Sequence, residues 1–128
     1  MDDAAAPRIM IIGDDSDFSY LMQRYVRQSG CQMLVADLSD DTLASARREK
    51  PQAIVLEADS PEARGWEMLR ALKADAITCD IPVVVCTWPD ERSRSLAEGA
   101  ADHLRKPVLY DDFMAALVNV EAFSPDVT

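Results

Sequence analysis

The sequence predicts an α/β fold in which helices cover both faces of a parallel β-sheet. Short apolar runs, typical of buried strands, alternate along the chain with amphipathic segments of helical length. The run 82–87, PVVVCT, is rich in β-branched residues and is the strongest strand signal. Five strands that alternate with five helices form a three-layer sandwich, for which the flavodoxin-like strand order 2-1-3-4-5 is the usual solution.

The five expected strands are short and mostly apolar. They cover residues 8–13, 31–36, 52–57, 82–87 and 101–104. The first, RIMIIG, is rich in isoleucine and stops at two consecutive aspartates, Asp14 and Asp15.

The helices are predicted from apolar residues that recur on one helical face. They cover residues 16–29, 40–49, 62–74, about 90–97 and 110–122. In the first helix Phe18, Leu21, Met22, Tyr25 and Val26 have this spacing. Asp15 or Ser16 is expected to cap its start, and Gly30 to follow its end.

The length and the net charge limit the number of domains and the kinds of partner that the sequence allows. The 128 residues suit one domain, 1–128, with a core of about 8–122 and flexible ends at 1–7 and 123–128. The formal net charge of −10 argues against direct binding to nucleic acid, which needs a basic face. A basic protein or a cation would suit this charge, or the charge only keeps the domain soluble.

The cysteines and the hydropathy pattern indicate a cytoplasmic protein. Cys31, Cys79 and Cys86 are odd in number and lack metal-type spacing, so we expect reduced thiols, with Cys86 in the core. Since no apolar run is long enough to cross a bilayer, a membrane is not an expected partner.

Polar residues follow several of the predicted strands. In such folds the functional crevice lies beyond the carboxyl ends of the strands. Asp14 and Asp15 follow the first strand, Glu57 ends the third and Thr87 ends the fourth. Lys106 follows the fifth, so these side chains are expected to meet at one edge of the sheet.

An enzyme on this sheet is the weaker alternative. A flavin or dinucleotide site needs a glycine-rich loop after the first strand, and the acids of GDDSDF would repel phosphate. The lone histidine, His103, leaves nothing around which to build a hydrolase triad. Glu57 as the general base of an uncharacterised flavodoxin-like enzyme stays a hypothesis without a substrate pocket.

Four stretches resemble the CheY-like receiver domain of two-component response regulators, from about Arg8 to Val120. They are RIMIIGDDSDF, PQAIVLEADSPEARGWEML, IPVVVCTWPD and GAADHLRKPV. In that family an acidic pair binds Mg²⁺, an aspartate on the third strand accepts a phosphoryl group, and a Thr or Ser and a Lys contact that group. The resemblance implies these contact roles for Thr87 and Lys106, and Pro107 follows the lysine as expected, through a peptide that is cis in many relatives.

The acidic half of the implied site departs from the family. Asp14 matches one magnesium ligand, whereas its partner falls on Gly13, or on Asp15 if the register slips by one. At Asp59 the family uses the backbone carbonyl for the metal. Binding of Mg²⁺ by Asp14, Glu57 and Asp59 is therefore expected to be weak or lost.

Glu57 falls on the phosphoacceptor position. Its added methylene moves the carboxylate by more than about 1 Å, and a misplacement of that size costs about 100-fold in rate. We expect no useful phosphorylation there, and instead an ion pair with Lys106, because a half-buried lysine is unfavourable alone. Glu57 would then act as a built-in negative charge, and mimicry of the active state is a further hypothesis. The alternative is a working phosphoreceiver that uses Glu57 or Asp59 with Mg²⁺.

Two further residues differ from the usual pattern. His103 falls on the position of the aromatic switch residue and is expected to be a half-exposed strand residue. Trp88 replaces a small residue after Thr87, where its indole either covers the site or offers a contact surface.

The resemblance also implies an interaction face on the fourth helix, fifth strand and fifth helix. Residues expected near it are Trp88, Arg92, Arg94, Leu96, His103, Tyr110 and Phe113. The implied partners are a sensor histidine kinase, another regulator or an output domain in the same polypeptide, and a homodimer through this face is a further hypothesis.

Overall fold

The computed structural model describes residues 6–59, 64–88 and 91–120. The strands are β1 (Arg8–Ile12), β2 (Gln32–Ala36), β3 (Ala53–Glu57), β4 (Val83–Thr87) and β5 (Asp102–Arg105). The helices are α1 (Ser16–Ser29), α2 (Asp40–Glu49), α3 (Arg64–Ala74), α4 (Arg92–Ala97) and α5 (Tyr110–Asn119). All neighbouring strands pair in parallel, in the order β2-β1-β3-β4-β5, which confirms the predicted flavodoxin-like fold.

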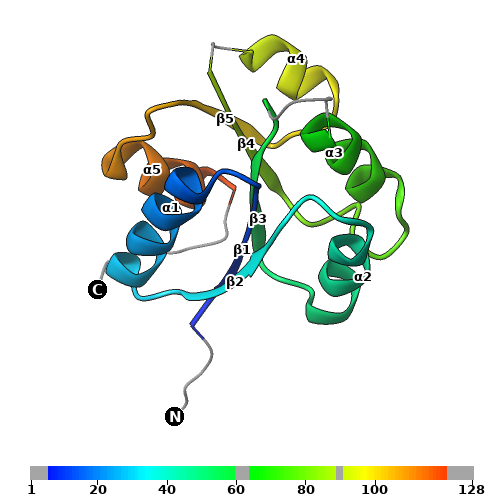
Figure 1. Cartoon of the computed structure of the whole chain (residues 1–128), viewed down its shortest axis with the longest axis horizontal. Coiled ribbons are helices and arrows are strands. Elements are labelled where there is room, and N and C mark those ends of the chain that lie inside the picture. Colours follow the sequence, from blue (N-terminus) through cyan, green and yellow to red (C-terminus); the bar gives the residue numbers. More distant parts are fainter. Residues whose placement is uncertain (1–5, 60–63, 89–90, 121–128) are drawn as a thin grey trace.

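The sheet is the middle of three layers. In Figure 1, α1 and α5 lie on one face of the sheet, and α2, α3 and α4 lie on the other. Alternate residues of β1 serve the two faces: Ile9 and Ile11 pack with residues of α1 and α5, and Met10 and Ile12 with residues of α2 and α3. This is the two-residue period of a strand that is buried on both sides.

Helix α1 has the bounds that its sequence predicts. Asp15 is the N-cap, and its side chain accepts a hydrogen bond from the backbone N–H of Asp17 at 3.0 Å. Gly30 follows the last residue, as expected. Phe18, Met22 and Val26 are buried, so the predicted apolar face is the one that contacts the sheet.

Helix α2 also has its predicted bounds, and the other described boundaries coincide with the predictions or differ by one to three residues. The strand expected at 101–104 is displaced by one residue, and α4 begins at Arg92 after the N-cap Glu91. The expected starts at 62–63 and 90, the expected helix end at 121–122 and the terminal segments 1–5 and 123–128 lie outside the described residues. Within the described part of the chain, no helix combines the length and apolarity that crossing a membrane requires.

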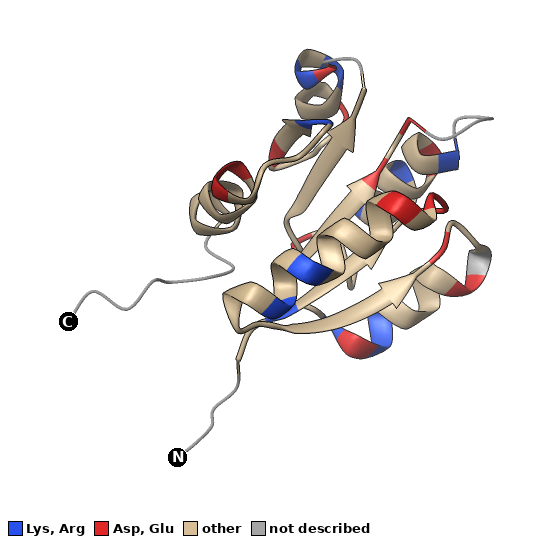
Figure 2. Ribbon diagram, turned by 60° about the vertical axis from the view of Figure 1, so that its left-hand side comes forward, with Lys and Arg blue, Asp and Glu red and all other residues tan. Residues whose placement is uncertain are grey.

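Several acidic residues lie at the carboxyl edge of the sheet. Figure 2 shows red segments in the loops beyond the strand arrowheads, and blue segments toward the far ends of α1 and α2 as well as on α4. Arg27 is in the last turn of α1, and Arg47 and Arg48 are in the last turn of α2. The arrangement complements the helix dipoles, because anions are favoured near helix N-termini and cations near C-termini.

Candidate functional site

Glu57 and Lys106 form an ion pair at the carboxyl edge of the sheet. Glu57 ends β3 and is only 3% exposed, and Lys106 directly follows β5. The Nζ atom of Lys106 lies 2.5 Å from Oε2 of Glu57, which confirms the predicted pair. Burial by itself lowers the pKa of Lys106, but hydrogen bonds and charges from Glu57 and Asp59 outweigh it, and the pKa is raised. Lys106 is therefore a cation at neutral pH.

Asp59 is a second carboxylate on the same lysine. Its Oδ1 atom lies 3.0 Å from Lys106 Nζ, and its Oδ2 atom accepts the backbone N–H of Trp88 at 2.7 Å. This role of the Asp59 side chain was not predicted, because the family pattern gives significance only to the backbone carbonyl at this position. A carboxylate two residues beyond an acidic strand end was the one available signal.

Gly13 and Glu57 fit each other sterically. The other carboxylate oxygen of Glu57, Oε1, accepts the backbone N–H of Asp15 at 3.2 Å. A Cβ atom added at Gly13 would lie 2.9 Å from that oxygen and 3.0 Å from the Cβ of Glu57. Position 13 therefore faces Glu57, whereas the side chain of Asp15 is turned to the helix N-terminus that it caps. The glutamate occupies space that a side chain at position 13 would need.

The third acid, Asp14, is bound by two other parts of the chain. Its Oδ1 atom accepts the backbone N–H of Leu38 at 3.0 Å, and its Oδ2 atom pairs with the guanidinium of Arg64 at the start of α3. Arg64 is a site residue that sequence reasoning missed, because nothing local links it to a residue fifty positions earlier.

The three acids do not fit Mg²⁺ as they are arranged. Mg²⁺ requires near-octahedral oxygen ligands. Each carboxylate oxygen of Asp14, Glu57 and Asp59 already contacts an N–H group or a side-chain cation. Among the residues described in 6–59, 64–88 and 91–120, no group of three or more His, Cys, Asp or Glu side chains is placed to hold a metal ion.

Thr87 and His103 form a buried pair beside the acids. Thr87 Oγ1 lies 2.7 Å from His103 Nε2, and the two residues are 0% and 5% exposed. The expectation that His103 is half-exposed is therefore wrong. His103 is opposite Val85 in the β4–β5 register, so its side chain points to a face of the sheet that the helices cover.

Two members of the expected interaction face are in fact interior. The His103 side chain is buried beside Thr87. Phe113 is 1% exposed because it packs in the core between α5 and the sheet. Trp88 and Leu96 are exposed, at 61% and 43%. Tyr110 is half-buried against Tyr25, with ring centroids 5.3 Å apart.

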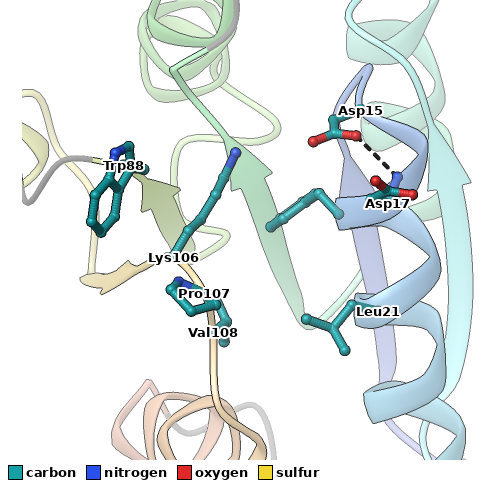
Figure 3. A pocket seen from close by; sticks show the side chains of 8 residues that line it. Asp15, Asp17, Leu21, Trp88, Lys106, Pro107 and Val108 are labelled. Atoms are coloured by element: carbon teal, nitrogen blue, oxygen red, sulfur yellow. Dashed lines mark hydrogen bonds between the residues drawn. The ribbon is translucent and has the colours of Figure 1, made fainter.

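An apolar pocket of about 420 Å³ opens beside the ion pair. Figure 3 shows it between α1 on one side and Trp88 and the segment 106–108 on the other. Its lining residues are Asp15, Asp17, Phe18, Leu21, Trp88, Lys106, Pro107 and Val108. Trp88 lines the pocket and is 61% exposed. The Lys106–Pro107 peptide at the floor is cis, as the resemblance implied.

Cys86 lies under the site but is chemically inert. It is fully buried in β4, as predicted for a core residue. Burial raises the pKa of its thiol, so the nucleophilic thiolate does not form at neutral pH.

Comparison with known proteins agrees with the fold. The model of the response regulator receiver domain family matches residues 9–118. Protein PilH of Pseudomonas aeruginosa is 34% identical over 104 residues, which are 79% of this chain and 86% of PilH. The transcriptional regulatory protein PrrA of Mycobacterium tuberculosis is 34% identical over 113 residues, which are 86% of this chain. The matched part is 48% of PrrA, so this chain spans about half the length of that relative.

Solved structures share the fold at low sequence identity. The chemotaxis protein CheY4 of Vibrio cholerae superposes with a TM-score of 0.80 at 19% identity, over 91% of this chain and 99% of that one. The receiver domain of the sensor histidine kinase PA1611 of P. aeruginosa gives 0.78 at 20% identity, over 91% and 99%. That neighbour has a magnesium ion coordinated in its active-site cleft.

Proposed function

Because this chain belongs to the response regulator receiver domain family, we propose that it is a receiver that signals through protein contacts without being phosphorylated. The observation that carries the proposal is the pair of carboxylates on Lys106, at 2.5 Å from Glu57 and 3.0 Å from Asp59. In a working receiver that lysine contacts the phosphoryl group. Here its charge is already balanced, and a phosphoryl group would add negative charge beside two carboxylates.

The fixed charge at Glu57 replaces a transient one. In a working receiver, the negative charge of the phosphoryl group attracts the lysine and the hydroxyl that face it. Glu57 attracts Lys106 permanently, because both groups come from the chain itself. The proposed receiver therefore has one state at this site, and its output is set by the abundance of the protein or of its partner.

The proposed contact surface consists of exposed apolar residues near α4 and α5. Trp88 and Leu109 are each 61% exposed, Leu96 is 43% exposed and Val118 39%. Partners of the expected classes are a sensor histidine kinase, another regulator or an output domain in the same polypeptide, in the cytoplasm. A second copy of the chain is the other candidate for this surface.

A phosphodonor experiment tests the proposal. The purified protein is incubated with Mg²⁺ and acetyl phosphate, beside a receiver that has an aspartate acceptor, and both are examined by intact mass spectrometry. We expect the control receiver to gain the mass of one phosphoryl group and this chain to stay unchanged.

The contradicting outcome has its own controls. If this chain gains a phosphoryl group, it is a working receiver, and the proposal is wrong. Glu57→Gln and Asp59→Asn, each close to isosteric with the residue it replaces, would then identify which carboxylate accepts the group. A change in Trp88 fluorescence with beryllofluoride and Mg²⁺ would contradict the proposal in the same way.

A further inference from the structure

Arg64 is placed where it can balance the charge that a divalent cation balances in a receiver. It is the first residue of α3, and its Nη2 atom pairs with Asp14 Oδ2. Its Nη1 atom lies 3.4 Å from the backbone carbonyl oxygen of Leu38. The same leucine donates its N–H to Asp14 at 3.0 Å. Asp14, Leu38 and Arg64 thus form a closed ring of contacts.

This ring joins residues that follow three different strands. Asp14 follows β1, Leu38 follows β2, and Arg64 begins the helix after β3. Leu38 is only 6% exposed, so the ring is anchored in the core cluster between the sheet and α2 and α3.

Gly65 keeps Arg64 in place. A Cβ atom at position 65 would collide with the backbone of Ala58 and with the carbonyl oxygen of Glu57. The first turn of α3 can therefore approach the end of β3 closely only with glycine there. Arg64 directly precedes this glycine, and its guanidinium reaches Asp14.

The charges at this edge of the sheet also depend on Arg64. Among the described residues, the carboxylates of Asp14, Glu57 and Asp59 are paired with two cations, Lys106 and Arg64. Lys106 contacts Glu57 and Asp59, and in this part of the chain the cation paired with Asp14 is Arg64. Without Arg64, one cation would face three carboxylates, and the net negative charge would favour a divalent ion.

We propose that the Arg64 guanidinium is a built-in counter-cation for Asp14, and that it excludes divalent metal from the carboxyl edge of the sheet. This inference deepens the proposed function, on which it rests, because a receiver that works without metal needs another cation there. Arg64 is a positioning residue: it pairs with Asp14 and contacts the backbone carbonyl of Leu38, in the connection between β2 and α2.

Manganese titration tests this role, with Mn²⁺ as a probe for Mg²⁺ and electron paramagnetic resonance as the measure of the free ion. Arg64→Ala is expected to bind Mn²⁺ at least about tenfold more tightly than the wild type, since one positive charge beside Asp14 is gone. Arg64→Lys keeps the charge and is expected to bind as weakly as the wild type. Arg70→Ala is the matched control, because Arg70 lies on the same helix and pairs with Glu98, at 2.8 Å, and not with Asp14.

Arg64→Gln covers the case in which Arg64→Ala does not fold. Glutamine has two amide N–H groups for Asp14 and Leu38 but no charge, and the same gain in Mn²⁺ affinity is expected. The proposal is overturned if the folded neutral variant binds Mn²⁺ no more tightly than the wild type, or if Arg70→Ala gains as much. Failure of this proposal can be distinguished from failure of the proposed function. The proposed function is tested by whether the wild-type protein gains the mass of a phosphoryl group, which does not depend on the Arg64 variants.

Discussion

The two halves of the carboxyl edge match the expected receiver pattern to different degrees. The β4–β5 half has Thr87 and Lys106 at the positions expected to contact a phosphoryl group and a cis peptide before Pro107, although Trp88 and His103 depart from the pattern. The β1–β3 half has Gly13 where an acid is expected and Glu57 where an aspartate is expected. The retained lysine now contacts the altered glutamate. The lysine expected to contact a phosphoryl group is thus paired with the residue that departs from the pattern.

Removing the retained cation should have the largest effect. Lys106→Ala leaves Glu57, whose side chain is 4% exposed, and Asp59 as neighbouring carboxylates without their shared counter-charge. We expect a loss of about 2–3 kcal/mol in the free energy of unfolding, below the usual cost of breaking a fully buried pair because Lys106 is partly exposed. Urea unfolding measures it. Arg105→Ala, at the exposed neighbouring residue, is the control and should cost about 0.5 kcal/mol or less.

The same variant should remove a pH dependence. Because the pKa of Lys106 is raised in the folded state, its stabilisation is fully present below the unfolded value, about 10.4, and is lost as pH rises through the folded value. Wild-type stability should therefore fall more steeply above pH of about 10.4 than that of Lys106→Ala. Parallel slopes for the two proteins would show that the ion pair contributes nothing to stability.

Substitutions at Gly13 and Glu57 should have coupled effects on the free energy of unfolding. Gly13→Asp introduces a Cβ atom 2.9 Å from Glu57 Oε1 and 3.3 Å from the ring of Phe18, and it adds a second carboxylate. We expect a loss of about 1–2 kcal/mol, and Glu57→Asp in the same chain should restore part of it by shortening the opposing side chain. Thermal or urea unfolding is measured for the wild type, Gly13→Asp, Glu57→Asp and the double variant. We expect the two substitutions to be coupled by about 0.5 kcal/mol or more.

Gly13→Ala separates crowding from charge in that cycle. If alanine costs as much as aspartate, steric overlap accounts for the effect, whereas a smaller cost assigns the remainder to repulsion between carboxylates. Additive costs for Gly13→Asp and Glu57→Asp would mean that the two positions are not matched to each other.

Local patterns were sufficient to predict the fold. The β-branched run of β4 and the apolar spacing of α1 determine their elements almost alone, since each buries a face that its own residues define. The Glu57–Lys106 contact was also predictable, because the carboxyl ends of β3 and β5 lie at the same edge of one parallel sheet.

The parts of the site that were missed depend on long-range placement. Arg64 reaches Asp14 because Gly65 permits a close approach of α3 to β3, which no periodicity encodes. The burial of His103 was missed because β5, with the sequence Asp102-His103-Leu104-Arg105, lacks an apolar run. Its environment is set by packing against α4, whose residue Arg92 donates to the His103 carbonyl oxygen at 3.3 Å.

The smallest effect is expected at the interior bond of the retained half. Thr87→Val keeps the shape of the side chain but removes the hydroxyl that lies 2.7 Å from His103 Nε2. A net loss of about 1 kcal/mol in the free energy of unfolding follows, since a single intramolecular hydrogen bond contributes about that much. Thr87→Ser, which keeps the hydroxyl, should retain the bond and lose only the contacts of one methyl group. If valine is as stable as threonine, the bond between Thr87 and His103 does not stabilise the buried position of His103, which then depends on its other contacts.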